Sequence, residues 1–285
     1  MIYLNGAFMP IAEAKIPVLD RGFIFGDGVY EVVPVYSGRP FRLGEHLRRF
    51  QNSMDTIRIV NPRSDAEWTR LTLEIIDRNG GGDLQVYYHV TRGVAAKRDH
   101  AFPPGIAPTV FMMANPLVTP SAELVQNGAA AVSAVDIRWL RCDIKAISLL
   151  ANCMMKQYAV DHDAAEVVMF RDGFLTEGSA SNIFVVKGGV LLAPPKDRLI
   201  LPGITYDVVI ELAKANGMPL EVRRVAEAEV RAADELWITS STKEVLAAAT
   251  LDGKAVGSGK PGPLFHNMHG WYQAFKTAVM RAPAA

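Results

Sequence analysis

A lysine within an apolar stretch is the residue of this chain with the most distinctive chemistry. Lys145 stands in the segment 144–150 (IKAISLL). An ammonium group inside a protein is costly unless it is paired, neutral or covalently bound. A lysine with a depressed pKa is the nucleophile that Schiff-base chemistry needs. The alternative is an exposed lysine that extends its ammonium into water, and the local sequence by itself favours that alternative.

A carboxylate followed by hydroxyl groups occurs at 177–182 (EGSASN), after a predicted strand. Glu177 at such a strand–loop junction could hold a protonated ring nitrogen. A plain polar turn has the same composition, and composition favours it.

Three segments offer groups that bind anions. The segment 201–205 (LPGIT) opens a predicted helix, whose first amides favour an anion, and Thr205 adds a hydroxyl. The segment 239–242 (TSST) ends a predicted strand, and Arg49 lies on a predicted helix. The alternatives are an ordinary helix cap at Thr205, a solvated turn and a solvated helix face.

Arg98 and His100 lie two residues apart in a predicted loop. Both side chains can donate hydrogen bonds to one carboxylate, although a pair of this kind in a loop more often faces solvent.

Composition excludes several classes of protein. The 30 Lys and Arg residues balance 30 Asp and Glu, so a broad nucleic-acid surface is disfavoured. No apolar run approaches the roughly 18–20 residues of a membrane helix. His266 and His269 have no cysteine or third histidine nearby, so we expect no metal site. Only Cys142 and Cys153 occur, and we expect a reducing, cytoplasmic setting without a membrane.

Periodic patterns predict the elements that must position these groups. In the first part of the chain a strand is predicted over 29–36, where Pro34 favours a sheet edge or a bulge. Ser64 is predicted to open a helix with a capping box, and Asn79 to help end it. Another helix is predicted over 45–57, and further strands over 84–91 and 109–113.

Two prolines interrupt strand-like runs at 115–121, which we take as a linker. Beyond it, strands are predicted over 166–170, 174–176, 182–186, 190–192 and 235–239, and helices over 205–215 and 263–280. The order is neither a regular β-α alternation nor an all-β pattern. We therefore predict an α+β fold with an N-terminal domain over 1–114, a C-terminal domain over 122–285 and a ligand between them.

The candidate groups together suit one ligand. A Schiff-base lysine, a carboxylate for a ring nitrogen and donors for a phosphate fit pyridoxal 5′-phosphate. Over nearly its whole length the chain resembles the fold-type IV pyridoxal-phosphate enzymes, most closely the D-amino acid aminotransferases. The segments that carry the resemblance are 20–22 (DRG), 25–31 (FGDGVYE), 90–93 (VTRG), 137–145 (IRWLRCDIK), 176–179 (TEGS) and 201–205 (LPGIT). The resemblance overturns the plainer alternatives for Lys145 and Glu177.

The resemblance implies a role for each candidate. Lys145, in the C-terminal domain, would form the Schiff base with the cofactor in the cleft between the domains, and then move the substrate proton. Glu177 would keep the ring nitrogen protonated, and Leu201 would pack against the ring. The groups implied to hold the phosphate are Arg49, the amides of Ile204 and Thr205, the Thr205 hydroxyl, Ser240 and Ser241.

The resemblance also implies a trap for the substrate carboxylate, formed by Tyr30, Arg98 and His100, the last two from the partner subunit of a homodimer. Lys145 works on one face of the cofactor. Fixing the carboxylate on one side therefore decides which enantiomer presents its Cα–H bond to the lysine. The implied reaction is transamination of D-amino acids, for example D-alanine and 2-oxoglutarate to pyruvate and D-glutamate.

Four alternatives remain within the same cofactor chemistry. They are an L-branched-chain aminotransferase, an (R)-amine transaminase, an aminodeoxychorismate lyase and a non-catalytic binder of the cofactor. Arg98 with His100 argues against the first two, because a simple amine has no carboxylate to trap. The chain departs from its relatives at Ala180 and Ser241, which replace serine and threonine, and in a loop before Arg98 that is one residue longer.

Overall fold

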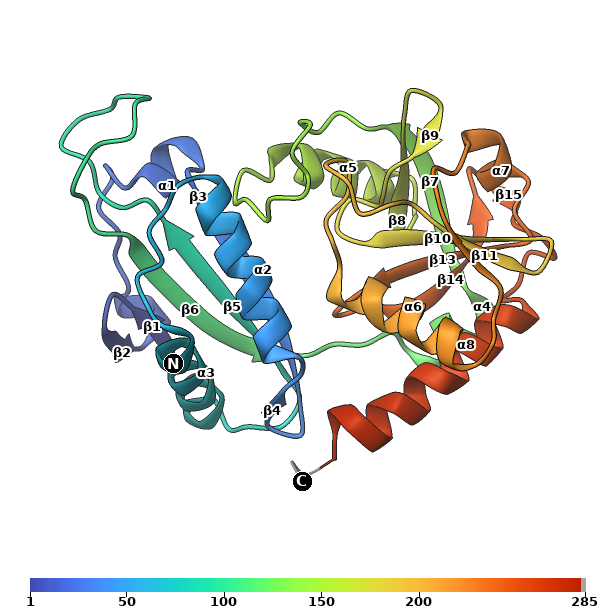
Figure 1. Ribbon diagram of the computed structural model, residues 1–285, viewed down its shortest axis with the longest axis horizontal. Helices are drawn as coiled ribbons and strands as arrows, with labels where there is room; N and C mark the ends of the chain where they lie inside the picture. Colours follow the sequence, from blue (N-terminus) through green and yellow to red (C-terminus); the bar gives the residue numbers. More distant parts are fainter. Residues whose placement is uncertain (283–285) are drawn as a thin grey trace. The chain divides into compact units, whose positions relative to one another are not determined.

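The computed structural model describes residues 1–282, and the chain divides into two compact units. Unit 1 comprises Met1–Leu117 and Ile144–Leu149, and unit 2 comprises Val118–Asp143 and Leu150–Ala285. Figure 1 labels the elements of both. Within residues 1–282, no helix is long and apolar enough to cross a membrane.

Unit 1 is built on an antiparallel sheet with strand order β2-β1-β6-β5-β3-β4. At one edge, β4 pairs with Val35 and Tyr36 only, so β3 is the last strand on that side at Pro34. This confirms the edge position that the proline predicts. The strands are β1 (Ile2–Leu4), β2 (Ala7–Met9), β3 (Gly28–Tyr36), β4 (Arg39–Pro40), β5 (Leu84–Thr91) and β6 (Thr109–Pro116).

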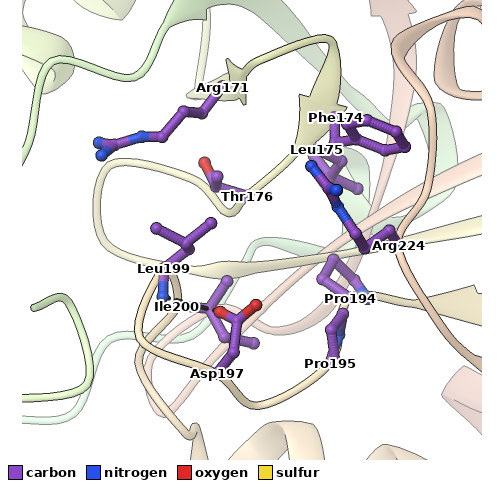
Figure 2. Close-up of a pocket in the computed structure, with 10 residues that line it drawn as sticks. All are labelled: Arg171, Phe174, Leu175, Thr176, Pro194, Pro195, Asp197, Leu199, Ile200 and Arg224. Atoms are coloured by element: carbon purple, nitrogen blue, oxygen red, sulfur yellow. Dashed lines mark hydrogen bonds between the residues drawn. The ribbon is translucent and has the colours of Figure 1, made fainter. Parts of the chain in front are cut away.

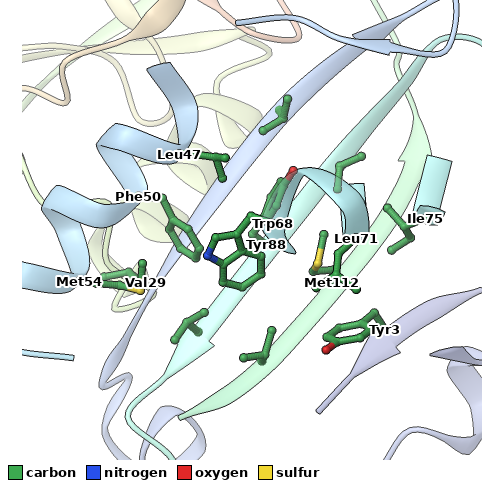
Figure 3. Packing of buried hydrophobic residues seen from close by; sticks show 14 of the residues in the cluster. Tyr3, Val29, Leu47, Phe50, Met54, Trp68, Leu71, Ile75, Tyr88 and Met112 are labelled. Atoms are coloured by element: carbon green, nitrogen blue, oxygen red, sulfur yellow. The ribbon is translucent and has the colours of Figure 1, made fainter. Parts of the chain in front are cut away.

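Two helices, α2 (Leu43–Thr56) and α3 (Asp65–Arg78), pack on one face of this sheet. The predicted capping box at Ser64 is present and starts α3. In the core, Phe50, Trp68 and Tyr88 meet edge to face, with ring centroids 5.6–5.9 Å apart (Figure 3). Alternate residues of β3 and β5 point into this core, which leaves the other sheet face to carry polar and aromatic groups.

The segment Ile144–Leu149 belongs to unit 1, although it lies far beyond the linker in sequence. Its backbone joins the start of β3: Tyr30 N donates to Lys145 O at 2.9 Å and Ile147 N donates to Gly28 O at 3.1 Å. The division therefore differs here from the sequence assignment, which placed Lys145 in the C-terminal domain. Hydrogen bonds to a distant strand edge decide its location, and local patterns cannot reveal them.

Unit 2 contains a mixed sheet with strand order β12-β11-β10-β13-β14-β7-β8-β9, and β15 pairs with β14. The pairs β7–β8, β7–β14 and β11–β12 are parallel. Its central strands are buried along nearly their whole length, as expected for a sheet covered on both faces. The strands are β7 (Ala129–Val135), β8 (Glu166–Arg171), β9 (Phe174–Leu175), β10 (Asn182–Lys187), β11 (Val190–Ala193), β12 (Leu220–Val222), β13 (Glu235–Ser240), β14 (Glu244–Leu251) and β15 (Lys254–Ala255).

Helix α5 (Leu150–Asp161) packs against β7 and β8, whereas α6 (Ile204–Ala215) and α8 (Pro263–Phe275) pack against β13, with α8 also on β14. The predicted terminal helix ends earlier than expected as an α-helix, and continues as a π-helical turn over Lys276–Met280. The short helices are α1 (Arg21–Phe25) in unit 1, and α4 (Ala122–Asn127) and α7 (Glu227–Arg231) in unit 2. These layers confirm the α+β class.

Candidate active site

Lys145 lies on unit 1 with its backbone fixed on both sides. Its carbonyl accepts from Tyr30 N, and its own N–H donates to Ser53 Oγ at 3.2 Å. The half-buried side chain places Nζ 4.2 Å from the centroid of the Tyr30 ring. In the part of the chain that the structure describes, no carboxylate lies within salt-bridge distance of this ammonium. An amine held by fixed backbone and left without an acidic partner is suited to act as a nucleophile and a base.

Tyr30 stands on the sheet face opposite α2 and α3. Its ring lies 5.7 Å from that of Tyr87 on β5, and the Tyr87 hydroxyl is 2.8 Å from His89 Nδ1. Burial raises the pKa of Tyr87 to about 12, and burial also lowers the pKa of His89, so both are neutral near pH 7. The surface beside Lys145 is therefore aromatic and uncharged.

Arg49 was predicted to bind a phosphate. In the structure its guanidinium forms a buried ion pair with Glu31. Its Nε and Nη2 donate to Glu31 at 2.9 and 2.6 Å. His46 Nδ1 lies 3.1 Å from the same carboxylate. Burial opposes the charge on Glu31, but Arg49 and His46 outweigh it and hold the pKa of Glu31 well below its usual range. Sequence reasoning missed this pair, although an acidic residue in register with Val29 and Val33 on a buried face could have indicated it.

Arg98 and His100 are both exposed, and the structure brings them together around one aromatic ring. The guanidinium carbon of Arg98 lies 5.2 Å from the centroid of the Phe25 ring, and the His100 ring lies 5.2 Å from the same centroid. Within residues 1–282, no hydrogen bond or ring contact connects either side chain to Tyr30 of the same chain. The pair therefore forms one cluster and Tyr30 with Lys145 forms another.

Glu177 is fully buried in the link between β9 and β10 of unit 2. Its Oε1 accepts from Arg138 Nη1, and its Oε2 accepts from Asn182 Nδ2 at 3.0 Å and from Leu201 N at 3.1 Å. Burial raises the pKa of Glu177 to about 7, and the hydrogen bonds from Arg138 and Leu201 N offset only part of this effect. The carboxyl group can therefore gain or lose a proton near neutral pH.

Arg138 is shared between Glu177 and a second buried acid, Asp136. Its Nε and Nη2 donate to Asp136 at 2.9 and 2.8 Å. Asp136 also accepts from the Thr176 hydroxyl at 2.9 Å, so it is fully engaged. The negative charge of Asp136 beside the same guanidinium opposes ionisation of Glu177, so the effect of burial on the pKa of Glu177 is only partly offset. Arg138 lies in one of the segments that carry the family resemblance, but the sequence predicted no role for it.

The start of α6 has the features of an anion site. Gly203 caps the helix without a side-chain hydrogen bond, so the amides of Ile204 and Thr205 are not satisfied by a cap. A Cβ at Gly203 would lie 2.1 Å from Asn182 Oδ1, so only glycine fits there. The Asn182 amide also donates to Leu201 O at 3.0 Å. One asparagine thus joins the turn before α6 to Glu177.

Ser240 ends β13 and Ser241 begins the turn to β14. The Ser240 hydroxyl accepts from Lys243 N at 3.0 Å, which shapes this turn. Asn182 pairs with Thr239 across β10 and β13, so the turn lies in the same part of the sheet as Gly203. Ser240 and the asparagine that binds Glu177 are therefore carried by adjoining strands.

Glu166 forms a further buried cluster that sequence reasoning did not find. Its carboxylate accepts from the hydroxyls of Ser179 and Ser181 and from Lys243 Nζ, the last at 2.5 Å. Burial raises the pKa of Glu166, but Lys243 and the two hydroxyls outweigh burial and lower it to about 2. The departure at Ala180 leaves this set complete, because the flanking serines supply both hydroxyls.

A small pocket lies beside the link that carries Glu177, and none of the predicted site residues line it. Figure 2 shows Arg224 next to the Phe174 ring. The guanidinium carbon of Arg224 lies 3.6 Å from the centroid of that ring. Thr176 and Ile200, the neighbours of Glu177 and Leu201 in sequence, line it from the other side. The remaining lining residues are Arg171, Leu175, Pro194, Pro195, Asp197 and Leu199.

The residues present fit pyridoxal 5′-phosphate on structural grounds. Glu177 is a buried acid that ionises near pH 7, which suits a protonated ring nitrogen. The uncapped amides at Ile204 and Thr205 suit a phosphate, and Lys145 is an amine without an acidic partner. These groups occur on both units, and each unit holds its own set in place.

Comparison with known proteins gives three consistent results. The sequence model of the amino-transferase class IV family matches residues 28–251. The chain is 42% identical to a D-alanine aminotransferase of Bacillus licheniformis, covering 94% of each chain. It is 37% identical to a D-alanine aminotransferase of Staphylococcus aureus, covering 96% of this chain and 97% of the relative.

Two solved structures have a similar fold. One is the branched-chain amino acid aminotransferase of Escherichia coli, with a TM-score of 0.89 and 26% identity over 98% of this chain and 94% of the other. The second is a branched-chain amino acid aminotransferase from T.th. with pyridoxamine 5′-phosphate, also at 0.89, with 29% identity over 99% and 95%. With the family model covering most of the sequence, this chain belongs to the class IV aminotransferases.

Proposed function

We propose that this enzyme transfers the amino group of D-amino acids, converting D-alanine and 2-oxoglutarate to pyruvate and D-glutamate with pyridoxal 5′-phosphate as cofactor. The observation that carries the proposal is that Arg98 and His100, on one exposed loop, both contact the ring of Phe25. Two cationic or donor groups so placed suit a carboxylate. The relatives at 37–42% identity, which are D-alanine aminotransferases, support the same substrate class.

The cofactor, when bound, supplies an electron sink for the negative charge that forms at Cα when the proton leaves. Lys145 is proposed to take that proton and to return it on the way to product. Its backbone is held by hydrogen bonds to Tyr30 and Ser53, which supports a base that acts from one side of the substrate. A fixed base and a fixed carboxylate together select one enantiomer.

Glu177 is proposed to hold the proton on the ring nitrogen. A buried carboxylate is costly without a full positive partner, and its raised pKa measures that cost. A cationic ring nitrogen supplies the missing charge, so Glu177 and the ring stabilise each other's ionised forms. Arg138 and Asn182 are proposed to keep the carboxylate aimed while this happens.

The phosphate is proposed to bind the amides of Ile204 and Thr205 and the hydroxyls of Thr205, Ser240 and Ser241, with Leu201 against the ring. The open helix start supports this assignment. Arg49 is proposed as a further contact of the phosphate, although its Nε and Nη2 already donate hydrogen bonds to Glu31. Its contribution is therefore proposed to be mainly the positive field of a held guanidinium.

A homodimer is proposed, in which Arg98 and His100 of each subunit serve the site of the partner. Their exposure supports this assignment, as does their lack of contact with Tyr30 among the described residues. A cytoplasmic location is also proposed. The supporting feature is the free state of both Cys142 and Cys153.

The test is the visible absorption of the purified enzyme with pyridoxal phosphate as amino compounds are added. D-alanine should remove the visible band by converting the cofactor to its amino form, whereas L-alanine and L-leucine should leave it. Adding 2-oxoglutarate should restore the band. Loss with the L-amino acids alone would refute the stereochemical assignment. Release of pyruvate from aminodeoxychorismate without an acceptor would favour a lyase.

A matched variant isolates the role of the lysine. Lys145→Ala should lower transamination by at least about 1,000-fold, because both the nucleophile and the base are lost. Lys156→Ala is the control, since Lys156 lies on α5 with its ammonium bound to Ala165 O at 2.7 Å. Full activity in Lys145→Ala would contradict the mechanism.

A further inference from the structure

The start of α1 contains a pair of charged residues that the proposed function has not used. Asp20 caps α1, with Oδ1 accepting from Gly22 N at 2.8 Å. Asp20 and Arg21 are each almost fully buried, with 1% and 3% exposure. Burying two charged side chains is costly. Because these two lie beside the loop that bears Arg98 and His100, we looked for a role in shaping that loop.

Asp20 closes the base of the loop. Its Oδ2 accepts from the hydroxyl of Thr91, the last residue of β5, at 3.0 Å. The same oxygen accepts from the hydroxyl of Thr109, the first residue of β6, at 2.6 Å. At Gly93, where φ is +110°, a Cβ would lie 2.0 Å from Ala107 O, so the two ends of the loop touch. The loop is thus clamped where it leaves and rejoins the sheet.

Arg21 holds the tip of the loop. Its Nη1 donates to Asp99 O at 2.5 Å and to Ala101 O at 3.3 Å, and its Nη2 donates to His100 O at 3.2 Å. Three successive carbonyls are therefore bound by one guanidinium. A planar fork with donors on both terminal nitrogens can do this, whereas the single ammonium of a lysine cannot.

Asp27 keeps Arg21 in this orientation. It accepts from Arg21 Nε at 2.7 Å, and from Arg92 at 2.8 and 2.9 Å. Burial opposes the charge of Asp27, but the hydrogen bonds from Arg92 and Arg21 outweigh it and lower its pKa. Arg92 in turn lies 3.5 Å from the centroid of Phe102, at the far end of the tip.

Phe25, one turn after Arg21, completes the support. The Arg21 guanidinium carbon lies 4.8 Å from the Phe25 centroid, and Arg98 and His100 contact the same ring at 5.2 Å each. The backbone of the tip and the side chains that it presents are therefore held by the same short helix.

We propose that Arg21 is a positioning residue for recognition of the substrate carboxylate: it fixes the 98–101 tip so that Arg98 and His100 present their donors in one geometry. This inference rests on the proposed function for its substrate, and on the hydrogen bonds above for its structure. Arg21 acts through Arg98 and His100, and it does not itself touch the substrate.

The first test uses a readout that needs no activity. Limited digestion with trypsin reports opening of this loop, because Lys97 and Arg98 provide cleavage sites within it. Arg21→Lys should raise the rate of cleavage there by about tenfold or more, because a tip freed from its carbonyl contacts opens locally more often. The matched control is Arg70→Lys, since Arg70 forms an exposed helical ion pair with Glu74. Equal cleavage in the wild type and Arg21→Lys would overturn the structural claim.

The second test separates recognition from chemistry. Arg21→Lys should raise KM for D-alanine by about 10- to 100-fold, because a small misplacement of a positioning group has a large kinetic effect. The affinity for pyridoxal phosphate should stay within about twofold of the wild type. Adding Arg21→Lys to Arg98→Ala should cost less than about threefold more, since residues that act as a unit are not additive. Additive losses would contradict the proposal.

The outcomes of the two claims are distinguishable. A wild type without D-alanine activity would refute the proposed function, and the cleavage experiment would still decide whether Arg21 holds the tip. If Arg21→Lys does not fold, Phe25→Leu keeps the carbonyl hydrogen bonds and removes the shared ring. This variant should raise KM for D-alanine, with cleavage close to that of the wild type. An unchanged KM in Phe25→Leu would overturn the claim that α1 orients the trap.

Discussion

Glu166 and Glu177 are both buried acids of unit 2, and their environments push them in opposite directions. Lys243 and two serine hydroxyls satisfy Glu166, and its pKa is lowered to about 2. Glu177 receives hydrogen bonds from Arg138, Asn182 and a backbone amide, and its pKa is nevertheless raised to about 7. Both carboxylates are buried, and they differ in the positive charge that lies beside each of them.

Arg138 explains why the charge falls short at Glu177. Asp136 takes two of its donors, so Glu177 competes with another buried acid for one guanidinium. Glu166 has an ammonium to itself. A buried carboxylate that has its own cation is neutralised inside the protein, whereas one left short of positive charge is suited to a cationic ligand.

The largest expected effect is a difference in kcat between variants of Glu177 and variants of Glu166. Glu177→Gln should lower kcat by about 100- to 1,000-fold, since the amide cannot carry the charge that stabilises a protonated ring. Glu166→Gln should lower kcat by less than about tenfold. Steady-state rates at saturating pyridoxal phosphate measure both. Equal losses would break the distinction between the two acids.

The next effect concerns the stability that Glu166 supplies. Lys243→Met should lower the free energy of unfolding by about 3 kcal/mol, because it leaves a buried carboxylate unpaired. The folded pKa of Glu166 lies below the unfolded value, so its contribution is present above about pH 4.5 and is lost as pH falls toward 2. Urea unfolding at pH 7 and pH 3 checks this. A penalty as large at pH 3 as at pH 7 would count against the assignment.

Glu177 should show the opposite pH dependence in the protein without cofactor. Its folded pKa of about 7 lies above the unfolded value of 4.5, so the stability due to its proton is present below pH 4.5 and lost as pH rises through 7. Relative to wild type, Glu177→Gln should gain about 2 kcal/mol between pH 5 and pH 8. Thermal unfolding at both values measures the change. A constant difference would contradict the raised pKa.

The smallest expected effect tests the hydroxyls around Glu166. Ser181→Ala removes a donor at 2.6 Å from its carboxylate, and should cost about 1–2 kcal/mol of unfolding free energy. Ser258→Ala, at an exposed turn, is the control and should change stability by less than about 0.5 kcal/mol. Similar values for both variants would remove the hydroxyls from the explanation of the low pKa.

Sequence patterns predicted the longer elements of unit 1, because its sheet has one buried face and its two long helices bury one side. The limits of α3 at Ser64 and Asn79 are an example. The short elements β1, β2, β4 and α1 were not predicted. In unit 2 several elements escaped prediction, among them β7, β14 and α5. The strand β14 reads EVLAAATL, whose alanines favour a helix, and only its central place in the sheet overrides that preference. Helix α5 exposes Leu150 and Met154, so it lacks a one-sided apolar pattern.

The candidate site divides in the same way. Lys145 and Glu177 were predicted from motifs that keep the family's spacing. The pair Glu166–Lys243 was not predicted, because it joins residues 77 positions apart in the sequence. Arg138 and Asp136 are neighbours in sequence, but their role depends on contacts with Glu177 and Thr176 from another segment. Arg49 showed the same limit: its helix was predicted, but its pairing with Glu31 depends on the sheet beneath.

The most direct test of the account is the protonation state of Glu177 in the protein without cofactor. Isotope-edited infrared spectroscopy distinguishes the C=O stretch of a protonated glutamic acid from the bands of a carboxylate. We predict a protonated band that titrates near pH 7, is absent in Glu177→Gln, persists in Glu166→Gln and disappears when pyridoxal phosphate binds. A Glu177 that stays ionised down to pH 5 in the cofactor-free protein would contradict the central claim.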